Sequence, residues 1–242
     1  MHLQDQIADW LVEYLASAKA DGFVLGLSGG VDSATTAALA VKAVGSESVL
    51  AAILPCQSQP IDAHLAQQMA ERFGIPTVRV DLDDAFDGLI ANLPESGNRL
   101  AAANIKPRLR MTTLYYLAQA HKYLVLGSGN RTELMVGYFT KYGDGGVDLL
   151  PLGDLYKTEV WELARELGVP KEIIERPPSA GLWPGQTDEG ELGLTYRELD
   201  QALMAIEAGE STGVPPAKLE EVQRLIASSR HKRTMPPIFE RS

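Results

Sequence analysis

Hydrophobic positions along the first 80 residues alternate between two spacings. Short apolar runs of β-favouring residues are separated by longer stretches in which apolar residues recur at helical spacing. This alternation predicts a strand–helix–strand–helix–strand order, and therefore a parallel sheet with right-handed crossover connections. The expected strands are residues 23–27, 49–54 and 77–80, and the expected helices are residues 4–19, 32–43 and 61–73.

The pattern continues less regularly through the rest of the chain. Residues 81–103 show no clear period, and a turn is expected at 94–98. A helix is predicted from about Pro107 to Ala120, because proline suits the first turn of a helix. A fourth strand is expected at 123–126, followed later by two packing helices, 196–208 and 216–229.

The first helix carries an apolar stripe that is expected to pack on the core, with a contact to a partner subunit as the alternative. Its members are Leu3, Ile7, Trp10, Leu11, Tyr14 and Leu15.

A glycine-rich turn joins the first strand to the second helix. Its sequence is Gly26-Leu27-Ser28-Gly29-Gly30-Val31-Asp32-Ser33. The glycines let the backbone approach an oxygen closely, and the helix N-terminus favours negative charge. Serine hydroxyls can add donors, and Asp32 can hold a divalent metal against phosphates. An ordinary tight turn is the alternative.

The turn differs from two common nucleotide loops. It lacks the lysine of a Walker P-loop and the glycine spacing of a redox dinucleotide fold. It is similar instead to the pyrophosphate loop of N-type ATP pyrophosphatases, which cleave ATP between the α- and β-phosphates to adenylate a substrate. The turn alone does not select one member of that superfamily.

Composition narrows the range of functions. The 242 residues are 45% hydrophobic and 22% charged, as in a globular protein with a sizeable core. No apolar run approaches the roughly 20 residues that span a bilayer, and no secretory signal is evident, so a cytoplasmic location is expected. The single cysteine, Cys56, excludes an internal disulfide and a Cys-rich zinc site, and is expected to be a small core-edge residue. The net charge of −10 argues against a nucleic-acid-binding surface.

Further motifs follow the fourth strand. Gly127-Ser128-Gly129-Asn130-Arg131-Thr132-Glu133 is expected to face the same crevice as the first glycine turn, because ligands of open α/β sheets bind at the carboxyl ends of the strands. The other motifs are 104–111, 137–148, 149–158 and His231-Lys232-Arg233. Together with the first turn, they resemble the NAD synthetase family in its short form, over residues 26–237.

The resemblance implies a single domain, residues 1–242, with a three-layer α/β/α fold, an open parallel sheet and an adenine nucleotide alpha hydrolase-like (Rossmann-like) topology. The implied enzyme is a ligase that forms a carbon–nitrogen bond in the last step of NAD biosynthesis. It converts deamido-NAD to NAD with ATP, Mg²⁺ and ammonia, through an NAD-adenylate that releases pyrophosphate and AMP. Free ammonia, or ammonia from a separate partner, is the expected donor, because 242 residues leave no room for an amidase domain. The family also implies a homodimer, with no nucleic-acid or membrane partner.

Matching the family motifs residue by residue implies the site. The residues expected to bind ATP are Gly26, Leu27, Ser28, Gly29, Gly30, Val31, Asp32, Ser33, Ser128, Lys157 and Ser179. Asp32 and Glu133 are the implied Mg²⁺ ligands, and these two with Lys157 are the implied catalytic residues. Arg108, Lys141, Asp148, His231 and Lys232 match the deamido-NAD contacts. Residues 177–191 form a hypothetical mobile lid.

Simpler interpretations stand beside these assignments. Glu133 and Arg108 are solvated helix residues in the alternative view, and His231 and Lys232 belong to a frayed basic tail. Two other functions also remain: another adenylating amidotransferase of the superfamily, and a non-catalytic ATP-binding module. The joint presence of Asp32, Glu133 and Lys157 argues against the second.

Overall fold

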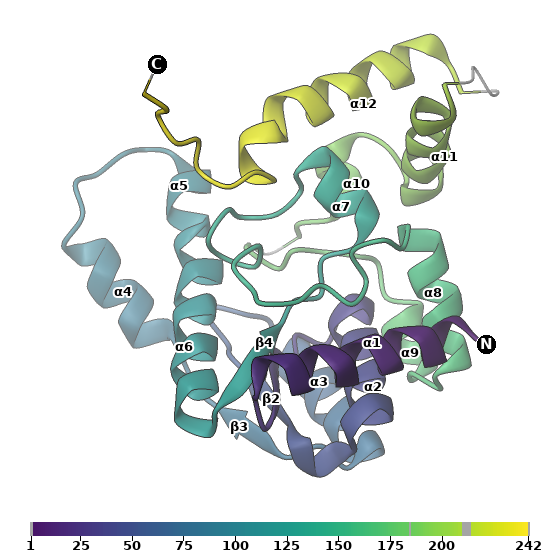
Figure 1. The fold of residues 1–242 in the computed structure, drawn as a ribbon. Coiled ribbons are helices and arrows are strands. Elements are labelled where there is room, and N and C mark those ends of the chain that lie inside the picture. Colours follow the sequence, from purple (N-terminus) through teal and green to yellow (C-terminus); the bar gives the residue numbers. More distant parts are fainter. Residues whose placement is uncertain (1, 184, 210–213, 242) are drawn as a thin grey trace.

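The chain forms a four-stranded parallel sheet flanked by helices. The structure is a computed structural model that describes residues 2–183, 185–209 and 214–241. The strands are β1 (Gly22–Gly26), β2 (Val49–Ile53), β3 (Thr77–Arg79) and β4 (Tyr123–Leu126), in the spatial order β3-β2-β1-β4 (Figure 1). Val24 of β1 pairs in register with Leu50 of β2 and Val125 of β4. The predicted parallel sheet is confirmed.

Helices cover both faces of the sheet, because side chains of β1 point alternately to either face. Phe23 and Leu25 pack into one core cluster, whereas Val24 packs into another. The first cluster is covered by α1 (Leu3–Ala18), α2 (Val31–Val44), α3 (Pro60–Phe73), α8 (Lys157–Glu166) and α9 (Lys171–Ile174). The second is covered by α4 (Asp83–Ala91) and α6 (Ile105–His121). The expected three-layer α/β/α architecture is thereby confirmed.

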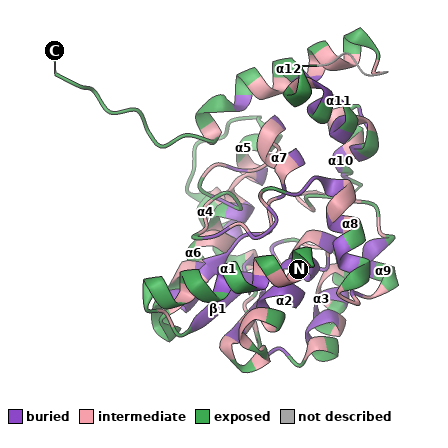
Figure 2. Ribbon diagram, turned by 45° about the vertical axis from the view of Figure 1, so that its right-hand side comes forward, coloured by how far each residue is buried: buried purple, intermediate pink, exposed green. Residues whose placement is uncertain are grey.

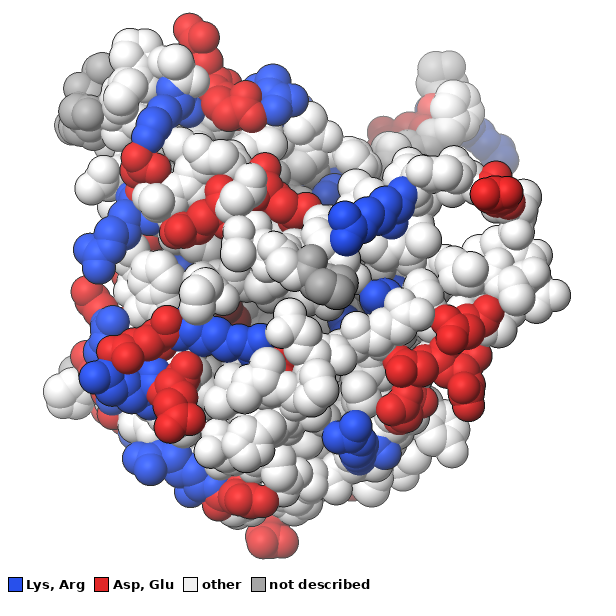
Figure 3. Space-filling view, turned by 180° about the vertical axis from the view of Figure 1, so that it is seen from behind, with Lys and Arg blue, Asp and Glu red and all other residues white. Residues whose placement is uncertain are grey.

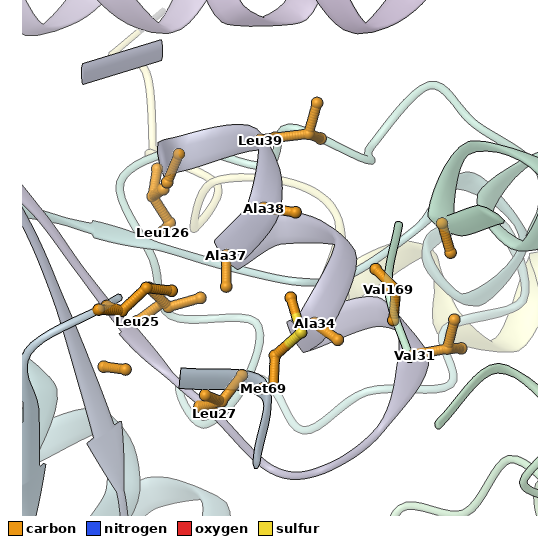
Figure 4. Close-up of a cluster of buried hydrophobic side chains, with 14 of the residues drawn as sticks. Leu25, Leu27, Val31, Ala34, Ala37, Ala38, Leu39, Met69, Leu126 and Val169 are labelled. Carbon is orange, nitrogen blue, oxygen red and sulfur yellow. The ribbon is translucent and has the colours of Figure 1, made fainter. Parts of the chain in front are cut away.

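Small side chains let α2 lie close to the sheet. Ala34, Ala37 and Ala38 are at most 2% exposed and pack in one cluster with Leu25 of β1 and with Leu27, which follows the strand (Figure 4). This close packing fixes the start of α2 relative to the end of β1, and so the shape of the glycine turn between them.

A third cluster lies beyond the carboxyl ends of the strands (Figure 1). It comprises α7 (Arg131–Val136), α10 (Asp188–Leu192), α11 (Tyr196–Ala208) and α12 (Pro216–Ser229), centred on the fully buried Tyr196. Two short 3₁₀ helices, η1 (Ser46–Ser48) and η2 (Arg230–Lys232), complete the elements. Past η2 the chain is extended and exposed (Figure 2).

Two predictions about the helices need correction. Residues 81–103 were expected to be irregular, yet they contain α4 and also α5 (Arg99–Ala103), whose start is capped by the Asn98 side chain. The stripe on α1 does not pack as a whole: Leu11 is buried, but Trp10 and Tyr14 are 40% and 42% exposed. Only one side of α1 contacts α2, so the stripe is wider than the surface that covers it.

The surface carries groups of carboxylates, in keeping with the net negative charge of the chain. Carboxylates gather on one side of the rear face (Figure 3), where α4 and the turn before it carry Asp81, Asp83, Asp84 and Asp87. In the described part of the chain, no helix has the length and apolar character needed to cross a membrane. Cys56 is fully buried, as expected for a small core-edge residue.

Candidate functional site

The glycine turn lies at the carboxyl end of β1 and is held open by its own hydrogen bonds. Gly29 has a φ of 79°, and a Cβ there would lie 2.5 Å from the Asp62 carbonyl oxygen, so only glycine fits. The Ser33 hydroxyl accepts from the Ser28 amide at 3.2 Å and donates to the Gly30 carbonyl at 3.0 Å. In the described structure no side chain caps the N-terminus of α2. The first amides of α2 are therefore available to an anion.

A buried lysine brings two carboxylates together beside this turn. Nζ of Lys157, at the start of α8, lies 2.5 Å from Oδ2 of Asp32 and 3.4 Å from Oε1 of Glu133. The Lys157 side chain is 1% exposed, and those of Asp32 and Glu133 are 17% and 16% exposed. The side-chain amide of Asn130 also donates, through Nδ2, to Oδ1 of Asp32 at 2.9 Å. The two glycine corners therefore lie side by side, and the solvated alternative for Glu133 is wrong.

Charge within this Asp32–Glu133–Lys157 triad is tightly balanced. Burial raises the pKa of Glu133 to about 8, opposed by the charge of Lys157 and reinforced by that of Asp32. Burial alone would lower the pKa of Lys157, but its attraction to Asp32 and Glu133 is stronger, and the net shift is upward. The lysine is therefore firmly charged, and Glu133 keeps its proton to a higher pH than an ordinary glutamate does.

The triad suits a magnesium ion that also binds phosphate. Asp32 and Glu133 converge on a single cationic atom, so they can share a second cation. Two carboxylates, completed by phosphate oxygens and water, meet the octahedral preference of Mg²⁺. Among the described residues no three His, Cys, Asp or Glu side chains gather into a metal site.

Three further residues of the site were not found by reading the sequence. The Tyr196 hydroxyl lies 2.9 Å from Oδ2 of Asp188 and 3.3 Å from Oε1 of Glu133, and its ring centroid is 4.8 Å from Nζ of Lys157. The Tyr138 hydroxyl lies 3.1 Å from Oδ1 of Asp188. These contacts attach α10 and α11 to the triad. No local pattern marks a buried aspartate that is reached from distant elements.

The backbone at the start of α8 is positioned by a second buried carboxylate. Thr132 Oγ1 accepts from the Lys157 amide at 3.0 Å and donates to Asp200 Oδ1 at 2.5 Å. The other Asp200 oxygen accepts from the Thr158 amide at 2.9 Å, and Asp200 is 2% exposed. Asp200 therefore positions the backbone of Lys157 without contacting the charged groups of the triad.

Four of the residues predicted to contact the dinucleotide lie together and form a basic corner. The Arg108 guanidinium donates to the Lys141 carbonyl at 3.2 Å, and Lys141 Nζ donates to the His231 carbonyl at 2.6 Å. Lys232 Nζ donates to the carbonyls of Gly137 and Phe139 at 2.7 and 2.9 Å. The frayed-tail alternative is therefore wrong for Lys232, and the chain end is tied to the loop after α7.

The remaining predicted residues lie apart from the triad. Asp148 accepts from the Val125 amide at 2.8 Å and the Tyr115 hydroxyl at 3.1 Å, which ties the edge of β4 to α6. The Ser179 hydroxyl donates to the Gln186 carbonyl at 2.8 Å, closing a loop within the predicted lid. Ser128 is half-buried within the second glycine corner. The structure shows no contact of these three with Asp32 or Lys157.

Comparison with known proteins supplies the family. A family model described as NAD synthase matches residues 3–236. The NH(3)-dependent NAD(+) synthetase of Carboxydothermus hydrogenoformans is 50% identical over 239 residues, covering 97% of this chain and 95% of the relative.

Two solved structures share the fold over nearly the whole chain. One, described as an NMN synthetase from Francisella tularensis, has a TM-score of 0.90 and 38% identity, covering 98% of this chain and 96% of the other. The NH3-dependent NAD synthetase of Campylobacter jejuni, in complex with nitrate, has a TM-score of 0.86 and 26% identity, with 98% of each chain covered.

Proposed function

The chain belongs to the NAD synthase family, and from that membership we propose that the Asp32–Glu133–Lys157 triad and the turn at 26–33 form the ATP half of its active site. The enzyme is an ammonia-dependent ligase that makes NAD from deamido-NAD with ATP as co-substrate. A nicotinate carboxylate oxygen attacks the α-phosphorus of ATP, and the bond to the β-phosphate oxygen breaks. Ammonia then attacks the carbonyl carbon of the adenylate, loses a proton and expels AMP.

The single observation that carries the residue assignment is the convergence of Asp32, Glu133 and Lys157 beside an uncapped helix N-terminus. The turn at 26–33 binds the departing pyrophosphate through its amides and serine hydroxyls. Lys157 moves from the carboxylates to phosphate oxygens when ATP binds. Asp32 and Glu133 would hold Mg²⁺, which would supply charge neutralisation for the departing pyrophosphate.

The basic corner serves the other substrate. Arg108, Lys141, His231 and Lys232 come from α6, the loop after α7 and η2, and a dinucleotide pyrophosphate needs positive charge from several directions. Asp148 is proposed to accept a hydrogen bond from a ribose or base of deamido-NAD. Tyr115, which binds Asp148, is seven residues beyond Arg108 on α6, about 10 Å along the helix axis, within the reach of a dinucleotide.

We also propose that residues 177–191 act as a lid that keeps water from the adenylate. The proposed lid includes residue 184, which lies outside the described residues. Asp188 ties the described part to Tyr196 of α11, whereas Gln186 and Ser179 form hydrogen bonds within the segment. If ATP and deamido-NAD together left protease nicking at this segment unchanged, the lid would lose its support. Ser128 and Ser179 are proposed to contact ATP once the lid closes.

A homodimer and a cytoplasmic location are also proposed, since the family resemblance implies the first and the composition favours the second. Light scattering at several concentrations tests the dimer directly. A monomer with full activity would remove it from the account.

Incubation with ATP, Mg²⁺, ammonium and deamido-NAD tests the reaction. We expect NAD, AMP and pyrophosphate in equal amounts, and no pyrophosphate when deamido-NAD is omitted. The structural likeness to an NMN synthetase, at 38% identity, favours nicotinate mononucleotide as a second candidate substrate. Parallel assays with the two acids decide the order of preference through kcat/KM.

A further inference from the structure

Tyr196 is a fully buried tyrosine that two neighbouring carboxylates of α10 fix at both ends. Its hydroxyl lies 2.9 Å from Oδ2 of Asp188, and its backbone amide donates to Oε1 of Glu189 at 2.9 Å. Its ring meets that of Trp161 edge to face, with the ring centroids 6.1 Å apart and an interplanar angle of 82°. These contacts hold the ring and the hydroxyl of Tyr196 in one orientation.

The same side chain contacts two members of the triad. The Tyr196 hydroxyl lies 3.3 Å from Oε1 of Glu133, and Nζ of Lys157 lies 4.8 Å from the ring centroid. A cation near the face of an aromatic ring is attracted to it, and more strongly where water is excluded. Tyr196 therefore restrains a carboxylate and an ammonium of the triad without adding a charge of its own.

The hydroxyl of Tyr196 has one hydrogen for two acceptors. It can donate fully to Asp188 or to Glu133, but not to both. The distances of 2.9 Å and 3.3 Å favour Asp188 while Lys157 also donates to Glu133. In the proposed reaction Lys157 leaves Glu133 for phosphate oxygens. Tyr196 is then the adjacent donor that can turn to the same oxygen, Oε1 of Glu133.

Asp188 also closes the base of the proposed lid. It is 4% exposed, and its Oδ1 accepts from the Ala180 amide at 2.9 Å. Its own amide donates to the Pro178 carbonyl at 3.1 Å, and the Tyr138 hydroxyl lies 3.1 Å from Oδ1. The carboxylate that fixes Tyr196 thus joins the two ends of the lid loop. A lid that opens at its base withdraws this support.

We propose that Tyr196 and Asp188 are positioning residues for the cleavage of ATP. Tyr196 keeps the Glu133 carboxylate in place when Lys157 moves to phosphate, and Asp188 fixes Tyr196 only while the base of the lid is closed. The triad is therefore correctly arranged only beneath a closed lid. The inference rests on the proposed roles of the triad and the lid.

Steady-state kinetics of NAD formation tests the role of the hydroxyl. Tyr196→Phe removes the hydroxyl and keeps the ring. Its kcat should fall by about tenfold to a hundredfold, the range of one hydrogen bond to a charged group, with less than about a twofold change in the KM for deamido-NAD. The matched control is Tyr156→Phe, which removes a tyrosine–carboxylate hydrogen bond to Glu207 in the same core cluster. Its kcat should stay within about twofold of wild type.

A double-mutant cycle tests whether Asp188 acts through Tyr196. Asp188→Ala should lower kcat about as much as Tyr196→Phe does, and the double variant should lower it no further, because both changes remove the same link. Tyr138→Phe, at a partly exposed position, keeps the test available if either variant does not fold. It removes one donor to Asp188 and should lower kcat by about two- to tenfold.

Hydrogen exchange measures the same coupling without turnover. The amides of Ala180 and Asp188 are hydrogen-bonded within the base of the lid. In Tyr196→Phe they should exchange at least about fivefold faster than in Tyr156→Phe, because local opening costs less once Asp188 loses its contact with α11.

Three results would overturn the inference. One is a kcat of Tyr196→Phe that matches Tyr156→Phe, with any loss confined to KM or Tm, which would indicate a structural role. Another is a double variant whose loss equals the product of the two single losses, since Asp188 would then act without Tyr196. The third is equal exchange of the Ala180 amide in both tyrosine variants. Each can occur while wild-type protein makes NAD and Asp32→Asn does not, so failure of this inference is distinguishable from failure of the proposed function.

Discussion

Replacing Lys157 by methionine should destabilise the protein by leaving two carboxylates without their cation. Removing one partner from a buried ion pair costs about 3–5 kcal/mol. The Asp32 and Glu133 side chains keep 17% and 16% of their exposure, so water can partly solvate them, and we expect the low end, about 3 kcal/mol. At roughly 2–4 °C per kcal/mol for a chain of this size, Tm should fall by about 6–12 °C.

The loss of stability in Lys157→Met should depend on pH and on magnesium. Burial already raises the pKa of Glu133 to about 8, and loss of the ammonium raises it further. Folded Glu133 binds its proton more tightly than unfolded Glu133 in both proteins, so both lose stability as pH rises from about 4.5 to 8, and only Lys157→Met continues to lose it above pH 8. Magnesium can replace the missing cation, so it should raise the Tm of this variant more than that of wild type.

Differential scanning calorimetry at several pH values, with and without Mg²⁺, makes these comparisons. Lys42→Met is the matched control, because its partner Asp5 is exposed and such pairs contribute little. Neutralising both carboxylates in the Lys157→Met background should recover most of the lost stability. A Tm for Lys157→Met within about 2 °C of wild type, with no selective effect of Mg²⁺, would refute the convergence of the carboxylates on one cation.

Three other substitutions test separate parts of the account. Gly29→Ala should abolish ATP binding in calorimetry, because its Cβ would meet a backbone oxygen at 2.5 Å, whereas Gly88→Ala on α4, with open space around it, should bind ATP normally. Asp200→Asn should lower the unfolding free energy by about 1–3 kcal/mol in urea and raise the KM for ATP, since one acceptor at the start of α8 is lost. Lys218 lowers the pKa of Glu198 to about 2. The pair therefore stabilises the fold above pH 4.5 and loses that effect as pH falls through 2. The difference in urea midpoint between wild type and Glu198→Gln should accordingly shrink from pH 7 to pH 3.

Local sequence patterns predicted the elements that build the sheet. The runs at 49–54 and 123–126 are apolar and short, and they became β2 and β4 because a parallel strand buried on both faces needs no alternation. Gly74 ends α3 in a left-handed conformation, a common way for a helix to end at a glycine. The helices within 81–103 were missed because α4 and α5 are short and hold their places by packing and capping more than by a long periodic pattern.

The candidate site residues also divide into those that a local sequence pattern reveals and those that only the folded structure brings together. Asp32, Glu133 and Lys157 were identified by motif, and the structure brings them together. Asn130 carries a usable local signal, since an asparagine three residues before a glutamate is a capping-box pattern. Asp188, whose partners are Tyr138 in the loop after α7, Tyr196 of α11 and the Ala180 amide, has no such signal, because its role depends on contacts between segments far apart in sequence.

The fate of one oxygen atom tests the central claim, that the site cleaves ATP by adenylating the substrate carboxylate. Deamido-NAD labelled with ¹⁸O in the nicotinate carboxylate is incubated with the protein, ATP, Mg²⁺ and ammonium, and the AMP is analysed by mass spectrometry. The account predicts one ¹⁸O in the phosphate of each AMP formed, and unlabelled pyrophosphate. Unlabelled AMP, or ADP as the product of ATP, would contradict it.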